Sequence, residues 1–301
     1  MNPMSTPAEV LRKEKDFTSH IVLRQMGERE PSIFDREAEI HMHLLSGLYQ
    51  FYLTAFNHRG LDGANGNITS HLMWSSDGQD HNNASMQGDR CNQLFFGAGS
   101  GRNVNVGTVI DILGHEATHA GPAPLATMSS DHTDSSTVIA HTSTLVYEDE
   151  TGALNESLAD CFGIMFKHWR LNQTDHATRD WLLGNGWLGR KGGLRSFADP
   201  SLYGQPWHYD GFEDMTEDDG GVHTNSGIAN YAFYLVCQAV EGPSWKIPGQ
   251  IWYDAMVDDD LGEDADFERF ARLTVCHASW DVERRVLLAW VRVGVLELEQ
   301  H

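Results

Sequence analysis

Cysteine is scarce in this chain, and its spacing excludes zinc-ribbon and disulfide-rich folds. Four cysteines are spread over 301 residues without a CxxC pair. Zinc ribbons and dense disulfide frameworks need closely spaced cysteines. One or two disulfides are still compatible with the spacing. The four residues are Cys91, Cys161, Cys237 and Cys276.

Long apolar runs and positive charge are also lacking. No stretch approaches the roughly 20 apolar residues that a membrane-spanning helix needs. Residues 1–30 are polar and charged and lack the apolar stretch of a signal peptide. The chain has 43 acidic against 21 basic residues, a formal net charge of −22. We therefore expect neither nucleic acid nor an anionic membrane surface as a partner.

Apolar residues make up 41% of the chain, enough for one large domain or two lobes that share a cleft. Residues 1–35 predict little regular structure, whereas residues 37–56 have a helical apolar spacing. Residues 60–107 are rich in Gly, Asn, Asp and Ser around short apolar runs, which is typical of strands and turns. Later helical patterns cover residues 109–120, 154–169 and 226–240, with two helices expected within residues 267–295.

A HExxH sequence, His115-Glu116-Ala117-Thr118-His119, lies in the helical pattern of residues 109–120. At 3.6 residues per turn, two residues four apart lie about 40° apart on one helix face. Both imidazoles can therefore reach one metal ion, with Glu116 beside the ion and not bound to it. A chance HExxH usually lies off any helix, but here the flanking VIDILG continues the helical pattern.

Catalytic zinc needs a third protein ligand and an open fourth position. Glu156 and Asp160 lie four residues apart on the helical pattern of residues 154–169. One carboxylate can bind the ion while the other orients an imidazole. Taken alone, such a pair is more often part of a solvated helix face.

Further segments, in the same order along the chain, resemble one family. VIDILGHEATHA resembles the first zinc helix of the thermolysin-like metalloendopeptidases, and YEDETGALNESLAD resembles their second. GGVHTNSGIANYAFYL is similar to their catalytic-histidine segment, and GLRSFADPSLYGQPWHY to the stretch before it. A weaker match, His81-Asn82-Asn83-Ala84, resembles the substrate-binding edge of the family. The resemblance runs from about Glu39 to the C-terminus.

The resemblance implies an α+β fold of two lobes with the active-site cleft between them. We expect a trimmed, β-containing N-terminal lobe and a mainly α-helical C-terminal lobe. The corresponding boundaries are an extension at residues 1–35, the N-terminal lobe at 36–122, an inserted loop at 123–144 and the helical lobe at 145–301.

The resemblance also implies one catalytic zinc ion and assigns the groups around it. The zinc ligands are His115, His119 and Glu156. Glu116 is the general base, and Asp160 hydrogen-bonds a ligating histidine.

Two further donors are implied for the oxyanion of the tetrahedral intermediate. His223 stabilises that oxyanion while Asp218 orients its imidazole, and Tyr147 is the second donor. A packed core tyrosine is the alternative interpretation of Tyr147.

The substrate contacts implied by the resemblance are less specific. Asn83 and the Ala84 carbonyl pair with the substrate backbone, and Arg195 binds the carbonyl beyond the scissile bond. Leu194 and Ile112 line an apolar pocket after the scissile bond, which predicts cleavage before bulky hydrophobic residues. For these two residues, plain core packing is the alternative.

The link between the two zinc helices is longer than in the family, and Gly121-Pro122 is expected to stop the first helix. The insertion contains residues that suit a second metal, a specificity loop or a lid, although a surface loop is the simpler interpretation. These residues are Asp131, His132, Asp134 and His141.

Calcium is a second departure from the family. Asp111 matches a family calcium ligand, but the partner positions hold Lys167, Leu182 and Asn185. A lysine repels the ion, and six or more oxygen ligands are hard to assemble from the rest. We expect the double calcium site to be absent or reduced, with Asp111 capping a helix or forming a salt bridge.

These observations predict a zinc-dependent endopeptidase acting on peptide or protein substrates. The alternatives are a catalytically silent zinc-binding or interaction protein and a narrow-specificity effector protease. An aminopeptidase is disfavoured because no GxMEN-like segment lies upstream of HExxH. The resemblance implies a secreted enzyme, although a cytoplasmic one remains an alternative.

Overall fold

The structure is a computed structural model, and its described part begins with two short strands, β1 (Arg12–Lys13) and β2 (Ser19–His20), which pair antiparallel. The other described residues are 33–61, 68–74, 83–86, 93–99, 105–119, 145–175, 177–187 and 192–298. Predictions for Asp131, His132, Asp134 and His141 therefore lie outside the described residues. The same holds for Cys91, His81, Asn82 and the Gly121-Pro122 helix stop.

The N-terminal half contains one long helix and a small mixed sheet, as the sequence predicted. Helix α1 (Ile33–Phe56) precedes β3 (Thr69–Trp74), β4 (Ala84–Met86) and β5 (Gln93–Gly97). The strand order is β3-β5-β4, with β3 parallel and β4 antiparallel to β5. Strand β4 is therefore an edge strand of this sheet.

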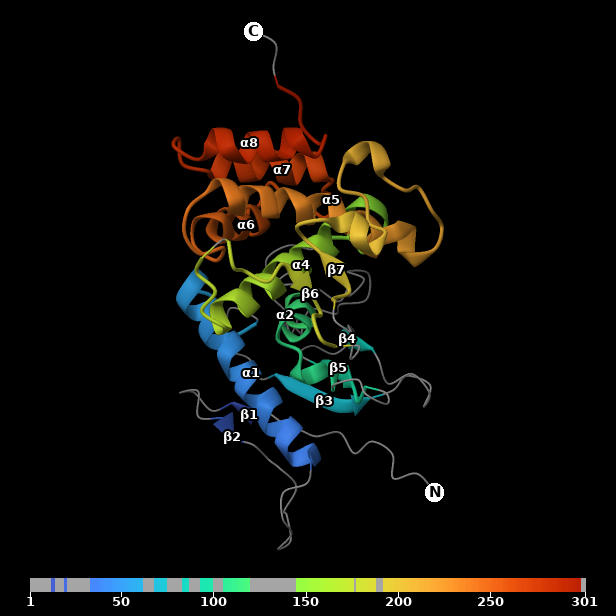
Figure 1. Ribbon diagram of the computed structural model, residues 1–301, viewed down its shortest axis with the longest axis vertical. Coiled ribbons are helices and arrows are strands. Elements are labelled where there is room, and N and C mark those ends of the chain that lie inside the picture. Colours follow the sequence, from blue (N-terminus) through green and yellow to red (C-terminus); the bar gives the residue numbers. More distant parts are fainter. Residues whose placement is uncertain are drawn as a thin grey trace, which may run out of the picture.

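The C-terminal half is helical, and its elements stack above the sheet in Figure 1. A 3₁₀ turn, η1 (Val106–Thr108), leads into α2 (Ile110–Thr118), which packs against α4 (Asp149–Arg170). A two-stranded hairpin of β6 (Leu182–Leu183) and β7 (Arg195–Ser196) precedes two 3₁₀ turns, η3 (Pro200–Tyr203) and η4 (Tyr209–Gly211). The remaining helices within the described residues are α5 (Asp218–Ala239), α6 (Ile247–Met256), α7 (Phe267–His277) and α8 (Glu283–Arg292).

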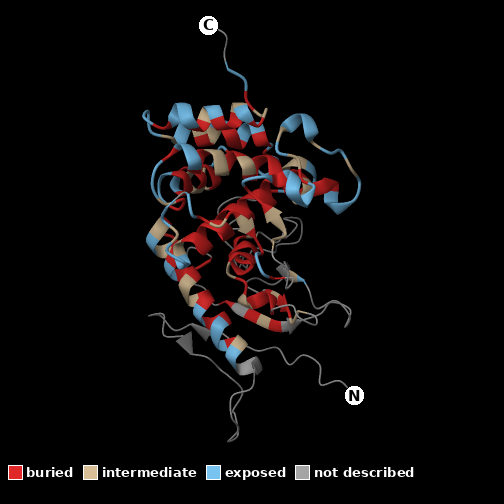
Figure 2. Cartoon of the chain, viewed as in Figure 1, coloured by how far each residue is buried: buried red, intermediate tan, exposed pale blue. Residues whose placement is uncertain are grey.

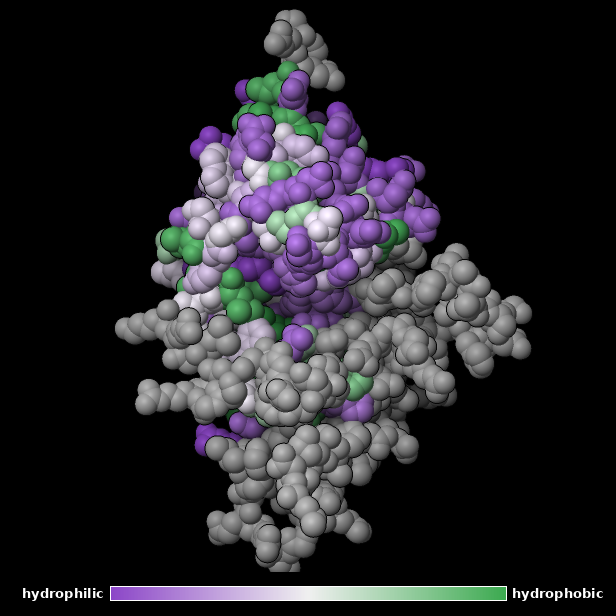
Figure 3. All heavy atoms as spheres, turned by 90° about the vertical axis from the view of Figure 1, so that its right-hand side faces the viewer, coloured by the Kyte–Doolittle hydropathy of each residue, from purple (hydrophilic) through white to green (hydrophobic). Residues whose placement is uncertain are grey.

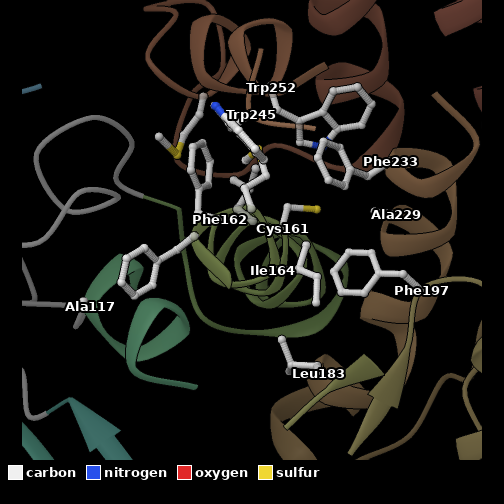
Figure 4. Packing of buried hydrophobic residues seen from close by; sticks show 14 of the residues in the cluster. Ala117, Cys161, Phe162, Ile164, Leu183, Phe197, Ala229, Phe233, Trp245 and Trp252 are labelled. Atoms are coloured by element: carbon white, nitrogen blue, oxygen red, sulfur yellow. The ribbon is translucent and has the colours of Figure 1, made fainter. Parts of the chain in front are cut away.

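Helix α4 forms the centre of the core, and Figure 2 shows it buried along most of its length. Its side chains Phe162 and Phe166 are fully buried. Figure 4 shows Cys161, Phe162 and Ile164 surrounded by residues of α2, α5, α6 and β6. Each large apolar side chain buried in this way contributes about 1.5–3 kcal/mol. This packing fixes α2 and α4 relative to each other.

Several element boundaries differ from the predictions. Helix α2 ends at Thr118, and His119 is its C-cap with an extended ψ of 142°. Helix α5 begins at Asp218 and contains a kink, whereas the pattern indicated a start at residue 226. Helix α6 was not predicted. The two helices expected within residues 267–295 are confirmed as α7 and α8.

The surface seen in Figure 3 is predominantly hydrophilic over the described residues, with separate small apolar patches. This is consistent with the acidic composition of the chain. Among the described helices, none has the length and apolar character required to span a bilayer.

Candidate active site

Two imidazoles at the end of α2 face each other. The Nε2 atoms of His115 and His119 lie 2.7 Å apart, and the two rings are nearly perpendicular. Although the helix ends before His119, the His119 backbone N–H still donates to the His115 carbonyl. This bond keeps the C-cap residue on the same side of the helix as His115.

Helix α4 places Glu156 opposite the two imidazoles. Its carboxylate oxygens lie 3.5 Å from His115 Nε2 and 3.2 Å from His119 Nε2. One ligand atom from each of the three residues lies within 4.8 Å of the others, a spacing that can hold a metal ion. Glu156 is fully buried, and its Oε2 has no hydrogen-bond partner among the described residues. A buried carboxylate oxygen without a donor suits a cation ligand, so these residues fit a metal.

The other ring nitrogens are oriented by the same helix α4. Asp160 Oδ1 lies 2.7 Å from His115 Nδ1, and Asn155 Oδ1 lies 3.2 Å from His119 Nδ1. Because an acceptor holds the Nδ1 side of each ring, Nε2 is left to face the metal position. Sequence reasoning gave Asp160 this role but missed Asn155. Asn155 stands directly before Glu156 but shares no helical spacing with Asp160, so the sequence carried no signal for its role.

Asp160 is also the centre of a buried network. Arg195 from β7 donates to both of its carboxylate oxygens at 2.7 Å, and Asn230 from α5 donates at 2.8 Å. Arg195 Nη2 lies 3.9 Å from Glu156 Oε2. The predicted substrate ligand Arg195 is thus at the site, but two of its donor nitrogens are already bound to Asp160.

The charges around the site shift several pKa values. Burial by itself raises the pKa of Glu156, but the neighbouring His119 and His115 outweigh it and lower that pKa well below the usual range. Burial opposes the charged form of His119 too, yet Glu156 raises the pKa of His119 to about 9. Asp160 has a lowered pKa because Arg195 and His115 outweigh its burial. The carboxylates are therefore held ionised, as metal binding requires.

Tyr147 and His223 both approach the same oxygen of Glu156. Tyr147 Oη donates to Glu156 Oε1 at 2.5 Å, and His223 Nε2 lies 3.4 Å from the same oxygen. The His223 side chain is 48% exposed, so it is open to a substrate. On its other side, His223 Nδ1 lies 2.6 Å from Asp218 Oδ1, and its backbone N–H donates to Asp218 Oδ2.

A left-handed turn positions His223 relative to Asp218. Residues 218–221 all have positive φ, between 49° and 89°. Two of them are the glycines Gly220 and Gly221, which adopt this region without a Cβ penalty, while Asp218 and Asp219 pay for it. The turn lets Asp218 reach both the backbone and the ring of the residue five positions later.

Glu116 lies on α2 between the two imidazole residues and is buried, with 8% of its surface exposed. Its charge contributes to the raised pKa values of His119, Tyr147 and Arg195. The carboxylate is therefore within electrostatic reach of the groups that surround the metal position.

The predicted substrate residues form two groups in the structure. Ala84 begins the edge strand β4, and the Oδ1 atom of Asn83, directly before the strand, accepts the Ala84 N–H. Ile112 and Leu194 both lie next to Gly184, which has a positive φ of 65°. A Cβ on Gly184 would lie 3.0 Å from Leu194 and 3.5 Å from Ile112. The structure thus brings this apolar pair together.

A second charged cluster lies between the first turn of α2 and the last turn of α4. The ammonium of Lys167 contacts Asp111 Oδ2 at 3.0 Å, Asp180 Oδ2 at 2.8 Å and the Leu182 carbonyl at 2.6 Å. We call Asp111, Lys167 and Asp180 the lysine cluster. Asn185 joins it through a bond to Asp180. Asp111, Lys167, Leu182 and Asn185, the positions compared with the family's calcium site, are thus close together. Asp180 also belongs to the lysine cluster, and no pattern in the sequence indicated it.

Comparisons with known proteins agree with this geometry. The family model described as "Thermolysin metallopeptidase, catalytic domain" matches residues 30–121. The model "Thermolysin metallopeptidase, alpha-helical domain" matches residues 143–295.

Individual relatives are similar over most of the chain. The "Extracellular metalloprotease" of Pectobacterium carotovorum subsp. carotovorum is 36% identical over 89% of this chain and 75% of its own length. "Protease PrtS" of Photorhabdus sp. (strain Az29) is 34% identical over 91% and 72%. The solved precursor of protealysin, a metalloproteinase from Serratia proteamaculans, superposes with a TM-score of 0.76 at 32% identity. That superposition covers 98% of this chain and 91% of the other.

Proposed function

The chain belongs to the thermolysin metallopeptidase family, and we propose that it uses one zinc ion to cleave peptide bonds that precede a bulky hydrophobic residue. The observation that carries this proposal is the convergence of His115, His119 and Glu156 with three polar groups around them. Those groups are Glu116, Tyr147 and His223.

The donor set supports zinc as the metal. Two imidazoles and one carboxylate are a ligand set of catalytic zinc sites, whereas magnesium and calcium prefer oxygen ligands. When bound, zinc supplies a Lewis acid that activates water and polarises the scissile carbonyl. Asn155 and Asp160 support it by fixing the ring orientations of His119 and His115.

Glu116 is the proton carrier in this proposal. Its carboxylate accepts a proton from the attacking water as the new C–O bond forms. It then gives that proton to the amide nitrogen as the C–N bond breaks, so that the leaving group departs as an amine. A buried carboxylate suits this exchange because few waters compete for its proton.

His223 and Tyr147 would stabilise the developing oxyanion. Tyr147 Oη and His223 Nε2 both lie beside Glu156 Oε1. Asp218 Oδ1 lies 2.6 Å from His223 Nδ1 on the other side of the ring and fixes its orientation. Such fixed donors are typically the largest single contribution to acyl-transfer catalysis.

The substrate backbone would pair with the edge strand β4. An edge strand offers unpaired backbone groups to an extended peptide, and Asn83 and Ala84 lie at its start. The side chain after the scissile bond would contact Leu194 and Ile112. This pair supports a preference for leucine or phenylalanine at that position.

We further propose that the enzyme acts outside the cell. The supporting observation is that the relative from Pectobacterium, which matches most of this chain, is described as extracellular. Detecting activity in the medium of the producing cells, with a cytoplasmic marker enzyme retained, is the expected outcome; activity confined to the cell lysate would contradict it.

The test is the hydrolysis of blocked, quenched peptides that differ only in the residue after the scissile bond. We expect Leu and Phe peptides to be cleaved at least tenfold faster than Ala peptides. Glu116→Gln should keep zinc, measured by elemental analysis, and lose at least about 1000-fold in kcat. Glu148→Gln, the same change at an exposed position, is the matched control and should keep full activity.

Other outcomes would replace the proposal. Zinc binding by an inert wild-type protein would favour an interaction protein. Cleavage of peptides with a free amino terminus and not of blocked ones would favour an aminopeptidase. Cleavage of a single protein and of no short peptide would favour a narrow-specificity effector protease.

A further inference from the structure

Lys167 is a buried lysine in the last turns of α4, and its surroundings are unusual for that residue type. Only 7% of its side chain is exposed. An ammonium buried in this way is stable only when its charge is paired and its donors are satisfied. Three acceptors, from Asp111, Asp180 and Leu182, surround the nitrogen at 2.6–3.0 Å.

These acceptors come from different parts of the chain. Asp111 lies in the first turn of α2, Asp180 lies in the loop after α4, and Leu182 belongs to β6. The Asp111 carboxylate also accepts the backbone N–H groups of Gly184 and Ile112. The ammonium therefore ties α2, α4 and the β6–β7 hairpin together at one point.

The apolar pair of the proposed substrate pocket lies directly beside this point. Ile112 follows Asp111 in α2, and Gly184 both donates to Asp111 and contacts Leu194. The Leu194 N–H donates to the Leu183 carbonyl across the hairpin, and Arg195 of β7 binds Asp160. Any shift of the hairpin relative to α2 would move both the pocket wall and Arg195.

The lysine cluster does not suit a divalent cation. Two carboxylates and one carbonyl already surround a positive nitrogen, and that nitrogen takes the centre that a calcium ion needs. A calcium site requires six or more oxygen ligands, whereas Lys167 contributes none and adds repulsion. The residues around Lys167 therefore do not fit the family's calcium site, one ligand of which Asp111 matches.

We propose that Lys167 is a positioning residue whose ammonium takes the place of a structural calcium ion and holds the hydrophobic substrate pocket in shape. The role in specificity rests on the proposed function, whereas the effect on stability does not. The geometry of the pocket is then independent of calcium, because the cation is part of the chain.

Thermal melting tests whether Lys167 stabilises the fold. The measurement uses the Glu116→Gln background, which prevents self-digestion. Lys167→Met should lower Tm by at least about 5 °C, because the buried Asp111 carboxylate and the partly exposed Asp180 carboxylate lose their cation. Arg272→Met, which breaks an exposed ion pair with Glu268, is the control and should shift Tm by less than about 2 °C. Equal shifts for the two variants would overturn the proposal.

Calcium titration tests whether the ammonium replaces the ion. The protein that retains Lys167 is first dialysed into calcium-free buffer. Adding about 5 mM CaCl₂, a concentration above typical site dissociation constants, should leave its Tm unchanged. Lys167→Glu, which gathers three carboxylates, should instead gain at least about 3 °C with calcium. A calcium-dependent rise with Lys167 in place, or none with Lys167→Glu, would overturn the replacement.

Peptide specificity tests the positioning role, measured well below the melting temperature with Glu116 intact. Lys167→Met should reduce the preference for Leu over Ala at least about fivefold in kcat/KM, mainly through KM. Lys167→Arg, which keeps a cation, should recover part of it. An unchanged preference would reduce Lys167 to a structural residue. If the Lys167 enzyme itself shows no such preference, the proposed specificity fails while the melting result still stands.

Discussion

Helices α2 and α4 contribute to two charged clusters, and in each cluster carboxylates are placed to be neutralised by a cation from a different source. At one, Glu156 beside His115 and His119 has an oxygen, Oε2, without a hydrogen-bond donor in the described part of the chain, and the exposed His223 lies next to its other oxygen. At the other, the Lys167 ammonium satisfies Asp111 and Asp180 from within the chain. Buried carboxylates need a cation in both places. A metal-dependent active site needs a cation that also binds water and substrate. A structural charge cluster only needs its carboxylates neutralised, which a lysine of the chain can do.

Of the changes that distinguish the two clusters, metal removal should have the largest effect on activity. Dialysis against a chelator should reduce peptide hydrolysis by more than about 1000-fold, because the Lewis acid is lost. Stoichiometric zinc should restore activity, followed with a Leu-containing quenched peptide, and calcium should not. Restoration by calcium alone would mean that the open cluster does not depend on zinc.

Asp160→Asn should have the next largest effect because Asp160 joins the metal site to Arg195. The variant leaves the buried Arg195 guanidinium without its ionic partner, a loss of about 3–5 kcal/mol in unfolding free energy. Urea unfolding on the Glu116→Gln background measures it. Asp258→Asn breaks the more exposed pair with His277 and should cost less than about 1 kcal/mol. Comparable losses would show that Arg195 finds another partner.

His168 should make the region of the lysine cluster sensitive to acid. Burial lowers the pKa of His168 from 6.5 to about 3, and its bonds to the Asp180 carbonyl and Ser244 do not offset this. Well above pH 6.5, His168 is neutral in both the folded and the unfolded chain, so this histidine does not reduce the free energy of unfolding. As the pH falls below 6.5 only the unfolded chain takes up the proton, and about 2 kcal/mol is lost by pH 5.

The pH dependence of urea unfolding checks this sign. His168→Gln, which cannot take up that proton, should reduce the slope between pH 6.5 and pH 5 while lowering overall stability. An unchanged slope would assign the acid sensitivity to another group.

Asn155→Ala should have the smallest effect of the four. It removes the acceptor that orients His119, and loss of such an outer contact typically weakens metal binding by about tenfold or more. Competition with a chromophoric zinc chelator measures it. Asn185→Ala removes an amide from the lysine cluster instead and should leave zinc affinity unchanged. Equal losses would mean that the two clusters are coupled through α2 and α4.

The sequence by itself determined the elements that depend on local periodicity and the residues that stand in a fixed spacing. The HExxH spacing indicated His115 and His119, and the helical pattern around Glu156 and Asp160 supplied the opposite side of the site. Helices α7 and α8 and the small sheet were equally predictable, because period and turn residues are local signals. Their exact ends were not, as His119 shows by lying beyond α2.

Only the tertiary structure decided which residues, far apart in the sequence, surround the same buried charged group. Asn155 and Asp180 have no distinguishing pattern, and their roles follow from the acceptors they place beside His119 and Lys167. The left-handed turn at residues 218–221, which lets Asp218 reach His223, likewise has no periodic signature. The physical reason is that pairing a buried charge depends on distances across the fold, which packing of α2 against α4 sets and sequence spacing does not.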